Sequence, residues 1–247
     1  MMKPFFKQVF YRLISLTGLS LFLLWSSVSM AQLRPFNVTY SSQWDVGIPL
    51  SGKAERSLIK NDDGSYRLTT KARAMFASIT ESSAFNLVDD QIQSHHYNYQ
   101  RKVLNKGHSV DVAFDWPNKK AKNTTQGSSW SMDIVQNTLD KQSIQLRLQF
   151  DLAKAPFIIG DTYTYQVADG GHLKAYQFIV DGEDLIKTPI GDYTSVRIKR
   201  VRDESTGLDT SFWFAAELDY TIVRILHIEE DGKRYQLNLK QLTWING

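Results

Sequence analysis

The feature that most constrains this chain is an alternation of apolar and polar residues with a period of two. Between Tyr66 and Ala74, apolar or small residues occupy every second position, and Arg67, Lys71 and Arg73 lie between them. Successive side chains of a strand point to opposite faces, so this alternation predicts a half-buried strand. The same alternation recurs at Val110–Trp116, Tyr176–Val180, Val196–Lys199 and Tyr235–Leu239.

Short turn signals separate these runs, and they indicate how the strands are connected. They are Asp63-Gly64, Asp169-Gly170-Gly171, Asp181-Gly182, Asp231-Gly232 and the weaker Pro117-Asn118. Strands joined by tight turns pair antiparallel in sequence order. We therefore predict a mainly β protein, an antiparallel meander curled into a barrel or half-barrel. The apolar parity switches between Leu239 and Leu242, which predicts a bulge near Lys240–Gln241.

Two segments do not fit the strand pattern cleanly. Residues 139–153 alternate as a strand does, but they are rich in helix-forming residues, and Thr138 or Asp140 can cap a helix start. The pattern alone leaves helix and strand open. Residues 118–131 are polar and are interpreted as a mobile hairpin end or loop, or as a division between two sheets.

The first residues have the features of a signal peptide. Lys3, Lys7 and Arg12 precede an apolar segment that ends in serines, and Ser29 and Ala31 are the small residues that a signal peptidase requires. We predict cleavage after Ala31, which leaves one domain over residues 32–247 in the periplasm. The alternative is an uncleaved membrane anchor, but such a helix needs about 20 apolar residues and this segment is shorter.

Charge and cysteine content limit the possible partners. Removal of the three basic leader residues lowers Lys plus Arg from 29 to 26, which equals the 26 Asp plus Glu. A neutral chain with scattered charge gives no electrostatic case for nucleic acid or an anionic membrane. The chain has no Cys, so it must be stabilised by its core and strand pairing. We expect a monomer without a cofactor.

No catalytic or metal-binding motif is evident. His95 and His96 are adjacent, so a strand would point them to opposite faces, and His108, His172 and His227 lack metal-ligand spacing. There is no Gly-x-Ser-x-Gly elbow. Three carboxylate pairs lie beside turns, where solvated charges are common: Asp89-Asp90, Glu183-Asp184 and Glu229-Glu230. We lean towards a protein that is not an enzyme.

Aromatic residues are the stronger candidates for a ligand site. Phe212, Trp213 and Phe214 are consecutive, so a strand would carry apolar side chains on both faces. One face can be covered by the helix, and the other by an apolar ligand or a partner. The alternative is that these rings, with others such as Tyr97, Tyr99 and Trp116, only fill the core.

A run of basic residues follows the predicted strand at Val196. Alternation places Arg200 and Arg202 on the same face as Val196 and Ile198. An inward arginine near the mouth of a barrel can bind an anionic head group. The alternative is a strand end that emerges into solvent.

Several segments resemble a known family. These are Asn137–Leu152, Lys187–Tyr193, Thr210–Ala215, Asp219–Ile225 and Gly232–Leu239. They are similar to the exported family numbered 3108 among the domains of unknown function. The resemblance implies a periplasmic, mostly antiparallel β-barrel-like domain with one mid-chain helix, and it favours helix over strand for residues 139–153. It implies no activity. Ile222 stands where the family often has Pro, which affects only the local backbone.

These observations favour a non-catalytic periplasmic protein that binds an amphiphilic or envelope-derived ligand, such as a lipid, an acyl chain or a glycan. The alternatives are an envelope scaffold that binds other proteins and, last, a hydrolase of envelope polymers. The expected ligand-binding residues are Phe212, Trp213, Phe214, Arg200, Arg202, Tyr97, Tyr99 and Trp116.

Overall fold

The computed structural model describes residues 33–45, 49–202 and 208–245, and residues 31–247 form one compact unit. The predicted signal peptide lies outside the described residues. In the part of the chain that is described, no helix is both long and apolar enough to cross a membrane.

The described residues build one antiparallel sheet of fourteen strands, in the order β8-β7-β6-β5-β4-β3-β2-β1-β14-β13-β12-β11-β10-β9. The strands are β1 (Phe36–Asp45), β2 (Pro49–Lys60), β3 (Tyr66–Ala74), β4 (Ala77–Val88), β5 (Gln91–Val103), β6 (Lys106–Asp115), β7 (Lys120–Thr125), β8 (Ser128–Asp133), β9 (Thr162–Asp169), β10 (His172–Thr188), β11 (Gly191–Val201), β12 (Asp209–Ala215), β13 (Thr221–Ile228) and β14 (Arg234–Trp244). A short 3₁₀ turn, η2 (Ala216–Leu218), joins β12 to β13. The prediction of a mainly β meander is confirmed.

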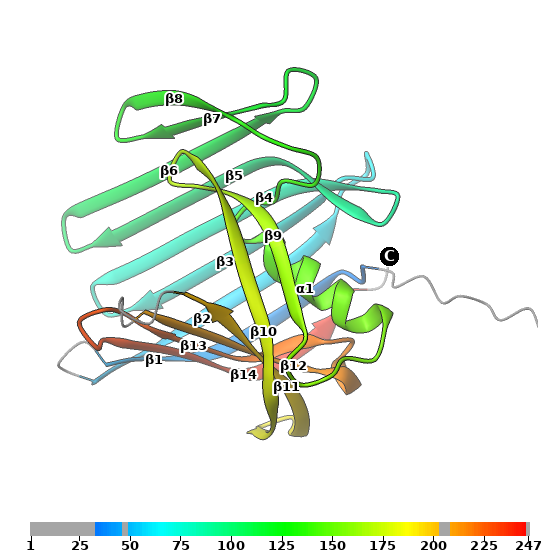
Figure 1. Cartoon of the computed structure of the whole chain (residues 1–247). Helices are drawn as coiled ribbons and strands as arrows, with labels where there is room; N and C mark the ends of the chain where they lie inside the picture. The colour runs from blue at the N-terminus through cyan, green and yellow to red at the C-terminus, as the bar shows by residue number, and fades with distance from the viewer. Residues whose placement is uncertain (1–32, 46–48, 203–207, 246–247) are drawn as a thin grey trace, which may run out of the picture. The chain divides into compact units, whose positions relative to one another are not determined.

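The sheet consists of two meanders, β1–β8 and β9–β14, which are joined where β1 pairs with β14. It curls around α1 (Ser143–Lys154) without closing into a continuous barrel (Figure 1). The predicted bulge lies in the joining pair, because Lys240 has no partner between Thr39↔Gln241 and Tyr40↔Leu239.

The two edges of the sheet approach each other through side-chain and loop contacts. The Trp130 indole of β8 donates a hydrogen bond to the Gly171 carbonyl of the β9–β10 turn, with a nitrogen–oxygen distance of 3.3 Å. Any β-carbon at Gly171 would collide with the Trp130 ring. In the chain after β8, the Ile134 N–H donates a hydrogen bond to the Lys119 carbonyl in the β6–β7 turn. Further along, Leu139 forms an isolated parallel β-bridge with Val167 of β9. The connection between β8 and α1 thus links the two edges.

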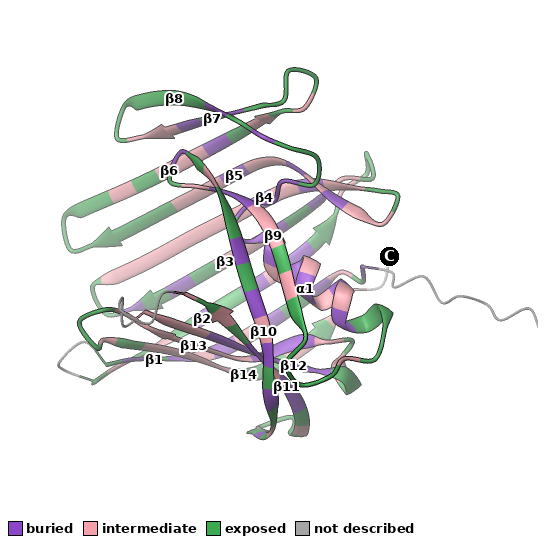
Figure 2. Ribbon diagram, viewed as in Figure 1, coloured by how far each residue is buried: buried purple, intermediate pink, exposed green. Residues whose placement is uncertain are grey.

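The segment over residues 139–153 contains a helix, as the family resemblance implies, but α1 begins only at Ser143. Ile144, Leu148 and Leu152 lie four residues apart on one side of α1, and Leu146 and Phe150 lie on the other. All five are buried. The helix therefore buries two opposite sides, which explains why its sequence alternates as a strand does. Figure 2 shows buried residues at intervals along α1.

Two local predictions are wrong. Asp181-Gly182 is not a turn, because both residues lie inside β10, where the pairing with β11 shifts by one residue. Residues 118–131 are not a loop or a division between sheets. They contain β7 and most of β8, a hairpin that continues the sheet to its edge. Thr124 and Ser129 hydroxyls bond across this hairpin, so polar side chains support a strand pair there.

Candidate functional site

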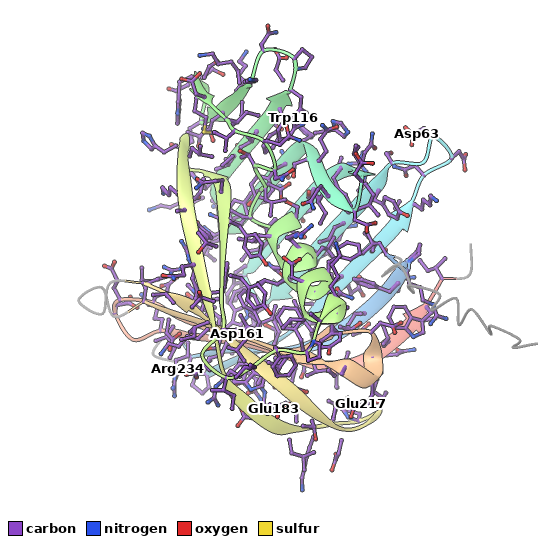
Figure 3. All side chains as sticks on the ribbon, turned by 45° about the vertical axis from the view of Figure 1, so that its right-hand side comes forward. Asp63, Trp116, Asp161, Glu183, Glu217 and Arg234 are labelled. Atoms are coloured by element: carbon purple, nitrogen blue, oxygen red, sulfur yellow. The ribbon has the colours of Figure 1, made fainter. Side chains whose placement is uncertain are left out.

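The concave face of the sheet carries a row of aromatic rings on its C-terminal half. Tyr176 and Phe178 of β10 are followed by Phe212 and Phe214 of β12, and the ring centroids of successive neighbours lie 6.3–6.5 Å apart. We call these four residues the aromatic row. All four are buried, and they belong to the same hydrophobic core as the buried residues of α1. Figure 3 shows side chains crowding the space between α1 and the sheet.

At one end of this row, two arginines point inward. Arg200 and Arg202 continue the face of the buried residues Val196 and Ile198 on β11, as the alternation predicts. The Arg200 guanidinium carbon lies 3.2 Å from the centroid of the Tyr176 ring. We call Arg200 and Arg202, with Tyr176, Thr210 and His227, the arginine corner.

Neither arginine has a carboxylate partner within 4.0 Å among the described residues. The nearby Asp169 is already engaged, because it accepts bonds from the Lys141 and Lys174 ammonium groups and from the Tyr176 hydroxyl. Burial acts to raise the pKa of Asp169, but the two lysines outweigh it and hold that pKa below its usual range. Burial and then Asp169 raise the pKa of Tyr176 to about 12.

The second arginine is in contact with a histidine through a hydroxyl. An Arg202 Nη atom lies 3.4 Å from the Thr210 hydroxyl, which lies 2.9 Å from Nδ1 of His227. Burial, followed by the charge of Arg200, lowers the pKa of Arg202. Burial, followed by the charge of Arg202, lowers the pKa of His227. The charges of Asp169 and Asp209 act on the pKa of Arg202 in the opposite direction, but no carboxylate among the described residues lies within 4.0 Å of either guanidinium group.

The guanidinium Nε atoms of both arginines are buried and have no hydrogen-bond partner among the described residues. A buried donor without a partner costs free energy, about 1–3 kcal/mol or more for a charged group. An anionic group with several oxygens would satisfy such donors and balance the two charges. The arginine corner therefore has the chemistry of an anion-binding site.

The N-terminal half of the concave face carries a different, polar cluster around Asp140. The Asp140 Oδ1 atom accepts the backbone N–H groups of Gln142 and Ser143, at 2.9 and 2.8 Å. Its Oδ2 atom accepts the hydroxyls of Ser83 on β4 and Ser94 on β5, at 2.6 and 2.8 Å. We call these five residues the capping cluster. The Ser143 hydroxyl in turn accepts the Asp140 N–H, so the helix start is a capping box.

The geometry of the capping cluster indicates that it stabilises the fold and does not bind a ligand. Asp140 has no exposed surface, and both of its carboxylate oxygens are engaged by two donors each. Burial raises its pKa, although the four hydrogen bonds act in the opposite direction. Beside it, the Tyr97 hydroxyl donates to Glu81 at 2.6 Å, and burial raises the pKa of Glu81. These groups anchor α1 to β4 and β5.

The structure brings together only some of the predicted ligand-binding residues. Phe212 and Phe214 share the concave face with Arg200 and Arg202. Trp213 faces the opposite side of β12, and only 7% of its surface is exposed. Its indole donates to Asp184 at 2.7 Å. The second face of this strand is thus covered by side chains of the protein itself, among them Asp184 and Arg224, and Trp213 lies apart from the other aromatic residues that were expected to bind a ligand.

The other three predicted residues lie on or beside β5 and β6, away from β11 and β12 in the strand order. Tyr97 is buried against Glu81. The Tyr99 ring centroid lies 6.3 Å from that of His108. Trp116 stacks on Phe114 and donates to the Ser94 carbonyl at 2.7 Å, far from Glu183 and Arg234 in Figure 3.

Sequence reasoning missed three members of the arginine corner: Tyr176, Thr210 and His227. The signal was present for Tyr176, which shares its parity with Phe178 and Val180. The predicted meander makes β10 to β13 neighbours, but no local pattern gives the register that places these side chains together. Among the described residues, no group of three or more His, Asp or Glu side chains is placed to hold a metal ion.

Comparison with known families identifies the chain. The model of a protein family of unknown function, DUF3108, matches residues 35–240. The chain belongs to the DUF3108 family. This match spans nearly all of the described sheet, from β1 to most of β14.

A solved structure shares the fold of this DUF3108 protein. It is the crystal structure of a beta-barrel-like protein of domain of unknown function DUF1849 from Brucella abortus. The similarity covers 87% of this chain and 99% of that chain, with a TM-score of 0.58 and 12% sequence identity. At this identity the likeness concerns the fold alone. No curated protein matches the chain.

Proposed function

We propose that this DUF3108 protein is a non-catalytic periplasmic binding protein for an anionic amphiphile of the cell envelope, whose charged group binds at the arginine corner. One observation carries the proposal: Arg200 and Arg202 lie side by side on the concave face, and among the described residues they have no carboxylate partner and their buried Nε atoms have no hydrogen-bond partner. Such pairs are typical of sites for phosphate or carboxylate groups.

The apolar part of the ligand is accommodated along a chain of rings that leads from the corner to the sheet rim. The Tyr235 ring centroid lies 6.2 Å from His227 and 5.7 Å from Trp44. Trp44 and Leu50 line an open hollow of about 430 Å³, together with Pro49, Leu226 and the polar or charged residues Gln43, Asp45, Ser51, Arg234 and Gln236. The aromatic row is less suited to this role, because α1 and the row are buried in one core. A ligand therefore binds at the rim and leaves α1 in place.

The test uses dodecyl phosphate below its micelle-forming concentration, with dodecyl maltoside as an uncharged ligand that has the same chain. Calorimetric titration should show binding of dodecyl phosphate by the wild type. The double variant Arg200→Gln/Arg202→Gln should lose at least about tenfold in affinity, because charge-assisted bonds are removed. If the wild type binds dodecyl maltoside as tightly as dodecyl phosphate, the charge of the head group does not contribute to binding, and the proposal is contradicted.

The matched control is Arg197→Gln. Arg197 lies on the same strand but the opposite face, where it pairs with Asp181 and Asp184 at 2.7 and 2.6 Å. The Arg197→Gln variant removes one arginine charge from β11 and leaves the arginine corner unchanged. Its affinity for dodecyl phosphate should therefore match that of the wild type. Equal losses in Arg197→Gln and in the corner variant would indicate a general charge effect and contradict the proposal.

A further inference from the structure

Two neighbouring hairpin turns at one end of the sheet present large apolar side chains to solvent. Met75 and Phe76 form the turn between β3 and β4, and Leu104 lies in the turn between β5 and β6. Their exposed fractions are 72%, 66% and 71%. The Leu104 N–H donates to the Phe76 carbonyl at 2.8 Å, so the turns are held together. We call these three residues the paired tips.

The backbone angles at two of the paired tips, Met75 and Leu104, are ones that side chains of this kind rarely adopt. Met75 and Leu104 have φ angles of 32° and 53°, in the left-handed region that glycine adopts without strain. A long apolar residue at such a position is strained, and its exposure gives no compensating burial within the chain. Neither side chain is buried against any described residue to offset this strain.

The charge around the paired tips has one sign. Arg73 precedes the first turn, and Arg101, Lys102 and Lys106 flank the second. None of the four is in an ion pair with a described residue. Residues 71–80 and 91–110 contain no Asp or Glu. On the neighbouring strand β2, Glu55 is paired with Lys53 at 2.6 Å. The near-neutral total charge therefore conceals a local basic cluster.

We infer that the paired tips dock on the surface of an anionic phospholipid bilayer, with Met75, Phe76 and Leu104 entering the head-group region and the flanking basic residues contacting lipid phosphates. Short apolar projections surrounded by Lys and Arg are suited to this interface, because the apolar groups leave water while the charges meet anionic lipids. The inference is independent of the ligand proposed for the arginine corner.

The position of the acidic turn fixes the orientation of docking. Strands alternate in direction, so the β13–β14 turn with Glu229, Glu230 and Asp231 lies at the same end of the sheet, separated from β3 by β14, β1 and β2. An anionic surface repels this turn. The molecule therefore approaches the bilayer tilted, with the paired tips first.

The test is co-sedimentation with vesicles of phosphatidylethanolamine and phosphatidylglycerol, compared with vesicles of phosphatidylcholine alone. The protein is purified after export, and its N-terminus is determined by intact mass, so that all variants carry the same first residues. The wild type should bind the anionic vesicles at least about tenfold better than the neutral ones, and high salt should weaken this binding.

The decisive variant is Met75→Gly/Leu104→Gly, which removes two apolar side chains and relieves both strained turns. Its melting temperature should equal or exceed that of the wild type, while its binding to anionic vesicles falls at least about tenfold. The control Ile158→Ser/Ile159→Ser removes two equally exposed apolar residues from the connection between α1 and β9, and its binding should be unchanged.

Three results would overturn the inference. The wild type could fail to bind anionic vesicles, or the glycine variant could bind them as the wild type does. In the third result, the wild type does not bind vesicles and sediments as a dimer in ultracentrifugation, whereas the glycine variant sediments as a monomer. In that case the paired tips are an interface between two copies of the chain.

Discussion

The two halves of the concave face hold the same helix by different means. On the β10–β12 side, the aromatic row and the buried residues of α1 form one apolar core. On the β4–β5 side, Ser83 and Ser94 hydroxyls bond the Asp140 carboxylate at the helix start. Apolar packing has no strict direction, whereas each hydrogen bond requires a partner in a defined place. The hydrogen bonds of the polar half therefore set where the helix begins, whereas the apolar core, which also includes Phe85 of β4 and Ile92 of β5, packs against the helix from both halves.

The largest expected effect is in the aromatic half. Phe214 of β12 is fully buried in the core, where its ring contacts that of Phe212. Phe214→Ala should therefore lower the free energy of unfolding by about 3–5 kcal/mol. Phe214→Leu, which leaves a smaller cavity, should lose less than half of that. Urea denaturation followed by circular dichroism measures both. Equal losses in the two variants would mean that cavity volume does not determine the cost.

The next effect is in the polar half. Asp140→Ala leaves the Ser83 and Ser94 hydroxyls and two helix N–H groups without their acceptor, and should cost about 2–4 kcal/mol. Asp140→Asn keeps a capping oxygen and should cost about half as much. Hydrogen exchange should show loss of protection at the first turn of α1 in the alanine variant. Unchanged protection there would show that the helix start is held by packing alone.

These two halves were not equally predictable from the sequence. The apolar alternation predicts the strands, the β sheet class and the inward direction of Arg200 and Arg202, because strand geometry depends on residues two apart. The capping cluster joins Ser83, Ser94 and Asp140 across separations of up to 57 residues. No local pattern carries such a contact, although Asp140 is recognisable as a helix cap.

The errors have physical reasons as well. Asp181-Gly182 has the composition of a turn, but glycine also allows a bulge, and here the strand continues through it. The polar segment over 118–131 lacks a continuous apolar face because its hairpin lies at the sheet edge, where only Ala121 and Asn123 of this segment are buried. The helix hides its period because it is buried on two sides.

The smallest expected effect is the pH dependence of the polar half. Burial raises the pKa of Glu81, so the folded chain binds this proton more tightly than the unfolded chain does. The free energy of unfolding should therefore fall as pH rises from the unfolded pKa, about 4.3, through the raised folded pKa. Glu81→Gln keeps an acceptor for Tyr97 and should make this decline shallower between pH 4 and 8. An unchanged slope in Glu81→Gln would assign the pH dependence to other groups.

The proposed binding of an anionic group beside Arg202 is tested most directly by the pKa of His227, measured by NMR with and without dodecyl phosphate. The charge of Arg202 contributes to lowering this pKa in the free protein. A bound anion offsets that charge, so the pKa of His227 should rise on binding, and it should not rise with dodecyl maltoside. A pKa of His227 that stays the same or falls at saturating dodecyl phosphate would contradict the account.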